Sequence, residues 1–481
     1  MRISARRAAS AAMACAALAS AARGMQSTEV PAPPQQKQVV LRHVEVRPCT
    51  PGTRTIADGW VTFEKGTIQA LGAEPMPPDR ARPDAHVIES RGHVLTPGLW
   101  ASASTLGLVE TLQVEATDDT TEFGDFHAEI KAATATNPDS DLPPVARNAG
   151  ILMVHAFPQG GIVGGHASAM RLDGWTALER TVRAEAGMVV RWPMMDAVQS
   201  RWTSRSPEEQ RKERDKAVAA IDRFFDEAEA YLRARAADPS LGVDARYESL
   251  RAVVARSEPV LVDANWPSQI EAAVLWAARR GYRPVIVGGL GAPEVAPLLR
   301  KHSVPVVVRG INRLPLRESD AHAAPYEVPA RLAAAGIAFS IASGDEPAHE
   351  RSLPAQAGRA VAHGLDAGLA LEAVTRMPAE IAGAGDRYGS IAPGKSATVV
   401  LWTGDPFEIT TSVRRAWIDG GEVDLNDRQK RMRAKYVEKD LQRDPPEPEP
   451  AEGGADPADA TPQAPPDAPR GAAPGPVSPG T

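Results

Sequence analysis

The stretch VLTPGLWASASTLG, residues 94–107, decides how the rest of the chain is interpreted. The apolar pair Val94-Leu95 leads to Pro97-Gly98, and an alternation of Ala and Ser follows Leu99-Trp100. Such a run is typical of a short buried strand whose end opens into a loop. We therefore predict a core strand at this point of the chain.

Further along, apolar β-branched runs alternate with helical ones. The strand-like runs are ILMVHAF (151–157), PVLVDA (259–264), PVIVGG (284–289), PVVVRG (305–310) and IAFSIAS (337–343). Helical stretches such as IEAAVLWAARRG (270–281) lie between them. This alternation predicts parallel strands joined by right-handed crossovers, and the number of strands favours a (β/α) barrel over an open sheet. No Gly-rich phosphate fingerprint marks a nucleotide site.

Two motifs carry a family resemblance. PGLWASAST (97–105) resembles the first barrel strand of the amidohydrolase superfamily, PGL(I/L)DxHxH, and GSIAPGK (389–395) matches its GxxxPGK signature. Within the superfamily the chain is most similar to imidazolonepropionase-like and prolidase-like amidohydrolases. The resemblance implies an α/β protein with a (β/α)8 TIM-like barrel, a small β-sandwich domain built from both chain ends, and hydrolase activity on carbon-nitrogen bonds.

The resulting domain prediction follows the chain in order. It comprises a signal peptide (1–21), a linker (22–37), the N-terminal part of the β-sandwich (38–95), the barrel (96–387) with an inserted helix (206–236), the C-terminal part of the β-sandwich (388–425), a helical extension (426–443) and a disordered tail (444–481) with 12 prolines. In the β-sandwich, Glu64-Lys65-Gly66 predicts a hairpin turn. The inserted helix is interpreted either as a packing helix or as a lid over the barrel mouth.

The expected metal ligands differ from the family pattern. The resemblance places Ala103 and Thr105 at the two histidine positions of the first strand, and neither side chain binds a divalent metal as imidazole does. Asp263 stands where the fifth strand usually has histidine, and Asp345 retains the acid of the eighth strand. We therefore expect no cofactor, although the two carboxylates would suit a weakly held divalent cation such as Ca²⁺ or Mg²⁺.

Other residues are candidates for binding a ligand at the barrel mouth. Glu122 and Asp125 belong to an acidic loop after the first strand, which is either a carboxylate site or a solvated loop. His166 follows a Gly-rich stretch (159–165), interpreted as an anion-binding loop or as a tight turn. Arg309 ends the strand PVVVRG, where it would pair with a substrate carboxylate or within the barrel.

Two functions remain open from these residues. In the first, the protein has lost the ordinary metal site and binds a small amide-like or peptide-like ligand, or supports an active amidohydrolase paralogue. In the second, it is an atypical hydrolase of C–N bonds that uses Asp263, Asp345 and acids of the 115–127 loop. A homo-oligomer is compatible with either function.

Composition and the chain start bear on location and partners. A net charge of -7 argues against nucleic acid as a partner. Arg2, Arg6 and Arg7 precede an Ala-rich apolar run and the small-residue pattern Ala19-Ser20-Ala21, which is typical of a secretory signal. A lipid anchor on Cys15 and twin-arginine export are alternatives. Beyond this segment no apolar run approaches the length of a membrane helix. We expect a periplasmic or secreted protein.

Overall fold

The computed structural model describes residues 29–198, 203–344 and 346–443. The predicted signal peptide and Pro-rich tail, and also Asp345, lie outside these described residues. The chain up to Lys430 forms one compact unit and the chain from Arg431 another, so each is considered by itself. Among the described residues, no helix combines the length and the apolar character that crossing a bilayer requires.

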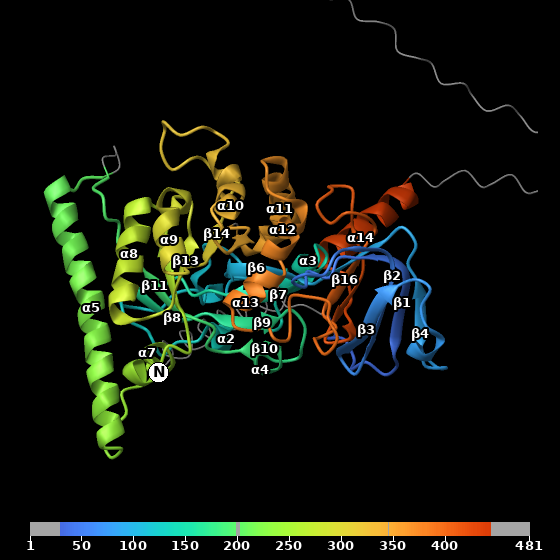
Figure 1. The fold of residues 1–481 in the computed structure, drawn as a ribbon, viewed down its shortest axis with the longest axis horizontal. Helices are drawn as coiled ribbons and strands as arrows, with labels where there is room; N and C mark the ends of the chain where they lie inside the picture. The colour runs from blue at the N-terminus through green and yellow to red at the C-terminus, as the bar shows by residue number, and fades with distance from the viewer. Residues whose placement is uncertain (1–28, 199–202, 345, 444–481) are drawn as a thin grey trace, which may run out of the picture. The chain divides into compact units, whose positions relative to one another are not determined.

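An eight-stranded sheet brings the two ends of the first unit together (Figure 1). Its strands are β1 (Val39–Val46), β2 (Ile56–Glu64), β3 (Thr67–Ala73), β4 (His86–Glu89), β5 (Val94–Pro97), β16 (Val399–Trp402), β17 (Val413–Ile418) and β18 (Gly421–Glu422). The β2–β3 hairpin turns at Lys65-Gly66, both with positive φ, as predicted. β1 pairs first with β4 and then with β5, so the sheet is branched at β1.

The remaining strands form two mixed sheets. A four-stranded sheet has the order β10 (Thr181–Arg183), β9 (Ser168–Arg171), β7 (Ile151–Ala156), β6 (Leu99–Ser104). A six-stranded sheet has the order β15 (Phe339–Ala342), β14 (Val306–Arg309), β13 (Pro284–Gly288), β12 (Val260–Ala264), β11 (Met188–Arg191), β8 (Val163–His166). The α/β class is as predicted, but the described strands do not close into a hydrogen-bonded ring of eight parallel strands.

The regular parallel order of a barrel is interrupted at the segment that we predicted to be a Gly-rich loop, residues 159–165. Its end forms β8, which runs antiparallel to β11, and β9 then runs antiparallel to β7. On the other side, β15 packs beside β6 without a hydrogen-bonded ladder. The four predicted runs β12 to β15 are parallel neighbours, as expected, and the unpredicted strand β11 pairs parallel with β12. We call the edge where these five strands end the mouth.

Small and branched apolar side chains from both sheets meet in one cluster, which we call the interior cluster. Its members are Ala103, Phe157, Ala167, Val189, Leu261, Val285, Val287, Val307, Ala342 and Ile381. All are buried, with at most 9% of each residue exposed. Burial of this kind is what the continuous apolar runs of parallel strands require, because both faces of such a sheet are covered.

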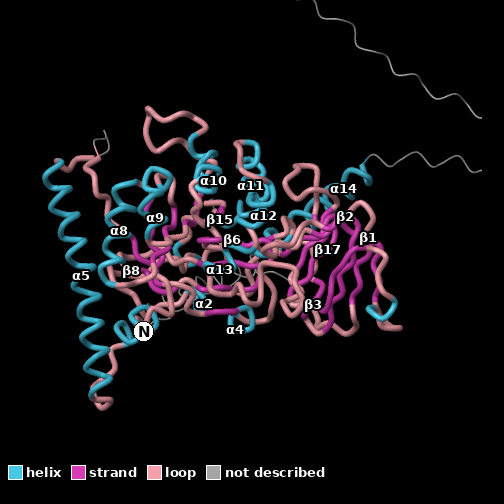
Figure 2. Tube along the Cα trace, in the orientation of Figure 1, coloured by secondary structure: helices cyan, strands magenta, loops and turns pink. Residues whose placement is uncertain are grey.

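Helices surround these sheets (Figure 2). They are α2 (Ala132–Ala135), α3 (Leu142–Arg147), α4 (Ala177–Arg180), α5 (Pro207–Ala237), α6 (Ala245–Ser249), α7 (Arg251–Val254), α8 (Pro267–Arg280), α9 (Ala296–Lys301), α10 (Ala324–Ala334), α11 (Leu353–Ala362), α12 (Ala367–Ala373) and α13 (Arg376–Ile381). One more helix, α14 (Arg428–Arg443), begins at the end of the first unit and belongs mostly to the second. Single turns of 3-10 helix are η1 (Pro78–Arg80), η2 (Glu115–Thr117), η3 (Ala292–Val295) and η4 (Pro347–Ser352).

The long helix α5 corresponds to the predicted insertion and begins with the capping box formed by Ser206 and Glu209. Its buried face carries Phe225, which contacts Trp276 of α8 with ring centroids 5.1 Å apart. Arg280 at the end of α8 donates hydrogen bonds to Asp222 and Asp226 of α5. These contacts make α5 a packing helix on the outer wall beside α8 (Figure 1).

Of the second unit, the structure describes residues 431–443, and all of them belong to helix α14. This helix has no buried residue, and it carries many more Lys and Arg than Asp and Glu side chains. Its polar character explains why the sequence predicts an extension there rather than part of the core.

Candidate functional site

At the mouth, two charged side chains from the ends of β12 and β14 are paired across the intervening strand β13. The Arg309 guanidinium donates to both carboxylate oxygens of Asp263, over 3.0 and 3.1 Å. The two side chains are 21% and 17% exposed, so the pair is largely shielded from water. The Arg309 guanidinium also lies 5.8 Å from the ring centre of Phe157, which belongs to the interior cluster. Arg309 was expected to pair either with a substrate carboxylate or within the barrel, and in the structure it pairs with Asp263 of the same fold.

The two residues at the expected histidine positions lie near and just after the end of β6. Ala103 sits at a bulge of β6, with φ of +48°, and its methyl group joins the interior cluster. Thr105 follows the strand and is buried, and its carbonyl accepts a hydrogen bond from the Leu108 amide in a tight turn. Neither side chain offers an imidazole or a carboxylate to the mouth. Asp345, the expected acid of the eighth strand, lies outside the described residues.

A cavity of about 430 Å³ opens beside Asp263. It is lined by Ile162, Arg191, Trp192, Pro193, Met194, Ala217, Asp263, Ala264, Asn265, Trp266 and Gln269. The side-chain oxygen of Asn265 is buried there without a hydrogen-bond partner among the described residues. Two indole rings, one guanidinium and two amides therefore surround a space large enough for a small organic molecule.

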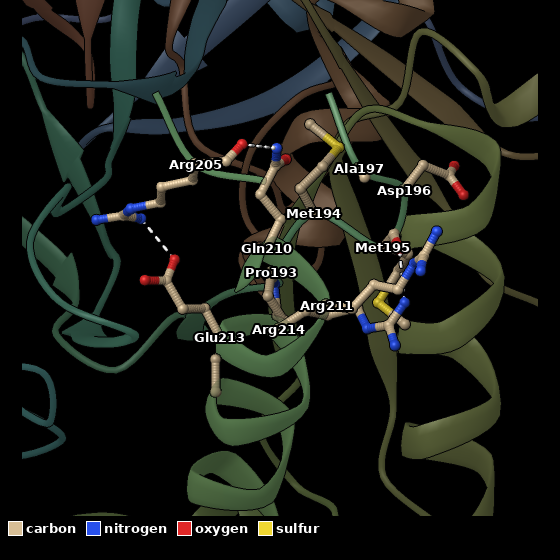
Figure 3. A pocket seen from close by; sticks show the side chains of 11 residues that line it. Pro193, Met194, Met195, Asp196, Ala197, Arg205, Gln210, Arg211, Glu213 and Arg214 are labelled. Atoms are coloured by element: carbon tan, nitrogen blue, oxygen red, sulfur yellow. Dashed lines mark hydrogen bonds and ion pairs between the residues drawn. The ribbon is translucent and has the colours of Figure 1, made fainter. Parts of the chain in front are cut away.

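A neighbouring hollow of about 300 Å³ lies between residues 193–197 and the start of α5 (Figure 3). Figure 3 shows Arg205 pointing toward Glu213, and the two side chains form an ion pair of 2.5 Å. Both are more than half exposed, so this pair is screened by water and contributes little to stability. We regard this hollow as a surface feature next to the cavity.

The acidic loop does not converge on the mouth pair. Glu122 and Asp125 are both exposed, and the carbonyl of Asp125 accepts hydrogen bonds from the amides of Ile162 and Val163. Asp118 bonds within its own turn to Thr120. This arrangement agrees with the alternative that the stretch is a solvated loop.

His166 lies at the opposite end of the strands from the mouth. We expected it after a Gly-rich loop facing a ligand, but Val163–His166 forms β8, which runs antiparallel to β11 and reverses the direction of the chain. His166 consequently pairs with Met188, the first residue of β11. Its Nδ1 atom lies 2.7 Å from Oε1 of Glu258, and both side chains are fully buried.

The sequence analysis did not single out several polar residues that line the cavity beside Asp263 or lie next to His166. Asn265 directly follows the predicted strand PVLVDA, so its place at a strand end was an available signal. Arg191 ends β11, a strand that the sequence analysis did not predict. Glu258, directly before PVLVDA, gave a weaker signal, since an acid in front of a buried strand is usually solvated. The described residues contain one group of three side chains able to share a metal ion, namely His166, Glu185 and Glu258.

A comparison with family models identifies the relationship. The model of the amidohydrolase family matches residues 162–423, which is more than half of the chain. The chain belongs to the amidohydrolase family. It is also similar to Amidohydrolase tasK of Hapsidospora irregularis, with 37% identity over 65 residues, which cover 14% of this chain and 7% of that protein.

Solved amidohydrolases share the fold. An amidohydrolase from Thermotoga maritima MSB8 superposes with a TM-score of 0.70 and 24% identity, covering 80% of this chain and 99% of that chain. A prolidase complexed with N-methylphosphonate-L-proline superposes with a TM-score of 0.50 and 17% identity, covering 81% of this chain and 100% of that chain. A Xaa-Pro dipeptidase with bound methionine superposes with a TM-score of 0.50 and 12% identity, and this match also covers 81% of this chain and 100% of that chain. These likenesses imply a TIM-barrel-like α/β fold for this chain.

The described residues at the mouth do not bring together the ligands of the metal centre that the family resemblance implies. Catalytic zinc sites need about three protein ligands. Here a methyl group and a hydroxyl occupy the first-strand positions, Gly288-Gly289 ends the sixth strand, and Asp263 is engaged by Arg309. No group of three metal-binding side chains occurs at the mouth among the residues with described positions.

Proposed function

We propose that this amidohydrolase-family protein binds a small amide-like or peptide-like ligand at the mouth and does not carry out ordinary metal-assisted hydrolysis. The observation that supports this most directly is the Asp263–Arg309 pair, placed over an interior cluster of apolar side chains. A carboxylate whose two oxygens accept from a guanidinium is a poor metal ligand, because its negative charge is already compensated.

The cavity beside the pair indicates the chemistry of the ligand. Arg191 lines it and suits a carboxylate, since a guanidinium and a carboxylate form charge-assisted hydrogen bonds. The Asn265 side-chain oxygen is an acceptor for an amide N–H, and Trp192 and Trp266 offer apolar contact area. A dipeptide or an N-acyl amino acid carries all three kinds of group.

Binding should depend on Arg191. In calorimetric titrations with dipeptides and N-acyl amino acids, we expect Arg191→Met to weaken binding by about tenfold or more, because it removes a charge-assisted hydrogen bond. Arg211→Met is the matched control, since Arg211 lines the neighbouring hollow and not this cavity. The same samples are assayed for hydrolysis with added Zn²⁺, Mn²⁺ or Ca²⁺. Turnover that requires one of these metals at the mouth would contradict the proposal and support the atypical hydrolase.

Export is a separate part of the proposal. It is supported by the order of basic residues, apolar run and Ala19-Ser20-Ala21 in the sequence, a segment outside the described residues. We expect the mature protein purified from the periplasm or the medium to begin at Ala22. Mass spectrometry of its N-terminal peptide tests this. A mature protein that retains Arg2 to Arg7 would contradict cleavage, and a lipid on Cys15 would show the alternative anchor.

A further inference from the structure

A buried polar cluster lies at the end of the strands opposite to the mouth. His166 ends β8, Glu185 precedes β11 by three residues, and Glu258 precedes β12 by two. Each of the three side chains offers one ligand atom, and these atoms all lie within 4.8 Å of one another. The parallel strands β11 and β12 begin here, whereas Asp263 lies near their other end. The cluster is therefore distinct from the place where the family's metal centre is expected.

Two atoms of this cluster are buried without a partner. His166 and Glu258 are at most 1% exposed. Nδ1 of His166 faces Oε1 of Glu258, which also accepts from the Gly187 amide over 3.0 Å. Nε2 of His166 and Oε2 of Glu258 have no hydrogen-bond partner among the residues described. Buried polar atoms are nearly always satisfied, so two orphaned atoms in one cluster point to a missing ligand.

The charges of the cluster favour a cation. Two carboxylates and one imidazole converge, and the described cation in direct contact with them is Lys131, whose Nζ lies 2.6 Å from Glu185. Lys131 enters the cluster from a segment that pairs with β8 at His166.

Two glycines beside the cluster allow neighbouring segments of the chain to approach each other closely. A Cβ atom on Gly187, whose φ is +142°, would lie 2.5 Å from Leu261, and one on Gly165 would lie 2.6 Å from the Ile130 carbonyl. Only glycine fits these two positions without a shift of the chain. The glycines thus bring the segments that carry the three side chains into contact.

We infer that His166, Glu185 and Glu258 form a binding site for one divalent first-row metal ion, with Zn²⁺ as the reference ion. An imidazole with two carboxylates matches the nitrogen and oxygen ligands that zinc accepts, while a purely alkaline-earth site would consist of oxygen atoms alone. The carboxylate beside Nδ1 would hold the ring in the tautomer whose Nε2 carries the lone pair. The ion would tie together three segments that are far apart in the sequence.

The test is zinc binding to the full chain, measured by competition with a chromophoric chelator. The wild type should bind one Zn²⁺ per chain, with affinity decreasing from Zn²⁺ through Mn²⁺ to Ca²⁺. Glu185→Gln should weaken zinc binding by at least about tenfold. Because Glu185 is half-buried and lies outside the strands, this variant should retain its thermal unfolding temperature without metal.

Two matched variants distinguish zinc binding at this cluster from binding at the mouth or on exposed carboxylates. Glu271→Gln makes the same change on an exposed position of α8, and Asp263→Asn alters the mouth. Both should bind Zn²⁺ as the wild type does. The inference is overturned if the wild type binds no zinc, if Glu185→Gln binds it unchanged, if Asp263→Asn abolishes it, or if Ca²⁺ binds as tightly as Zn²⁺. Binding of a dipeptide at the mouth is measured separately, so failure of one proposal does not affect the other.

Discussion

Replacing Phe157 by Ala is expected to lower the free energy of unfolding by about 3–5 kcal/mol. The ring is 1% exposed and fills the interior cluster together with Ala103, Leu261 and Val307. Truncation removes apolar contacts and leaves a space that rigid strands on both sides cannot close. It also removes the aromatic face near the Arg309 guanidinium. Urea unfolding followed by tryptophan fluorescence and circular dichroism measures the difference.

Phe123→Ala is the matched control, because Phe123 is 95% exposed and its truncation should change stability by less than about 0.5 kcal/mol. A cost below about 1 kcal/mol at Phe157 would mean that the interior is loosely filled. That result would contradict the view that apolar packing occupies the space beneath the mouth, and would favour an open site there.

The second large effect concerns His155 and pH. His155 lies in β7, is 3% exposed, and its Nε2 is buried without a partner among the residues that the structure describes. Burial lowers the pKa of its imidazole to about 4, against a weaker opposing hydrogen bond that the imidazole donates to the Ala186 backbone. The unfolded chain takes up this proton near the ordinary pKa of 6.5. As the pH falls from about 6.5 toward 4, the unfolded state therefore binds more protons and the folded state loses stability.

Between about pH 7 and about pH 5 this single group should cost about 2 kcal/mol of unfolding free energy. His155→Leu removes the titrating group, so its unfolding free energy should fall less over this range than that of the wild type. His86→Leu is the control, because it makes the same substitution at an exposed position of β4. An equal pH dependence in His155→Leu and wild type would show that His155 takes up its proton in the folded state as readily as in the unfolded one.

Much of the fold could be predicted from local patterns. The apolar runs that became β12, β13, β14 and β15 are continuous because parallel strands are buried on both faces. The capping box at Ser206 and the apolar spacing after it marked the start of α5, since these signals act within a few residues. The GxxxPGK and PGL motifs indicated the family, which the family model confirms.

The antiparallel course of β8 was missed. Gly160 to Gly165 contains four glycines, which are typical of a loop, and no local pattern indicated that the following residues would pair with β11. Strand pairing here depends on partners about 25 residues away in the chain, and glycine permits many backbone conformations. As a result, the sequence could not show whether His166 lies at the mouth or at the opposite end of the strands.

The sequence by itself determined which chemical groups exist at the mouth. Ala103 and Thr105 carry no imidazole, and no folding of the chain can supply one at those positions. Only the tertiary structure decided which charged groups meet. Asp263 and Arg309 are 46 residues apart in the chain, and His166 and Glu258 are 92 residues apart, yet each pair is in hydrogen-bond contact. Hydrogen bonds and ion pairs act over a few ångströms in space, and strand order and direction, rather than separation along the chain, set those distances.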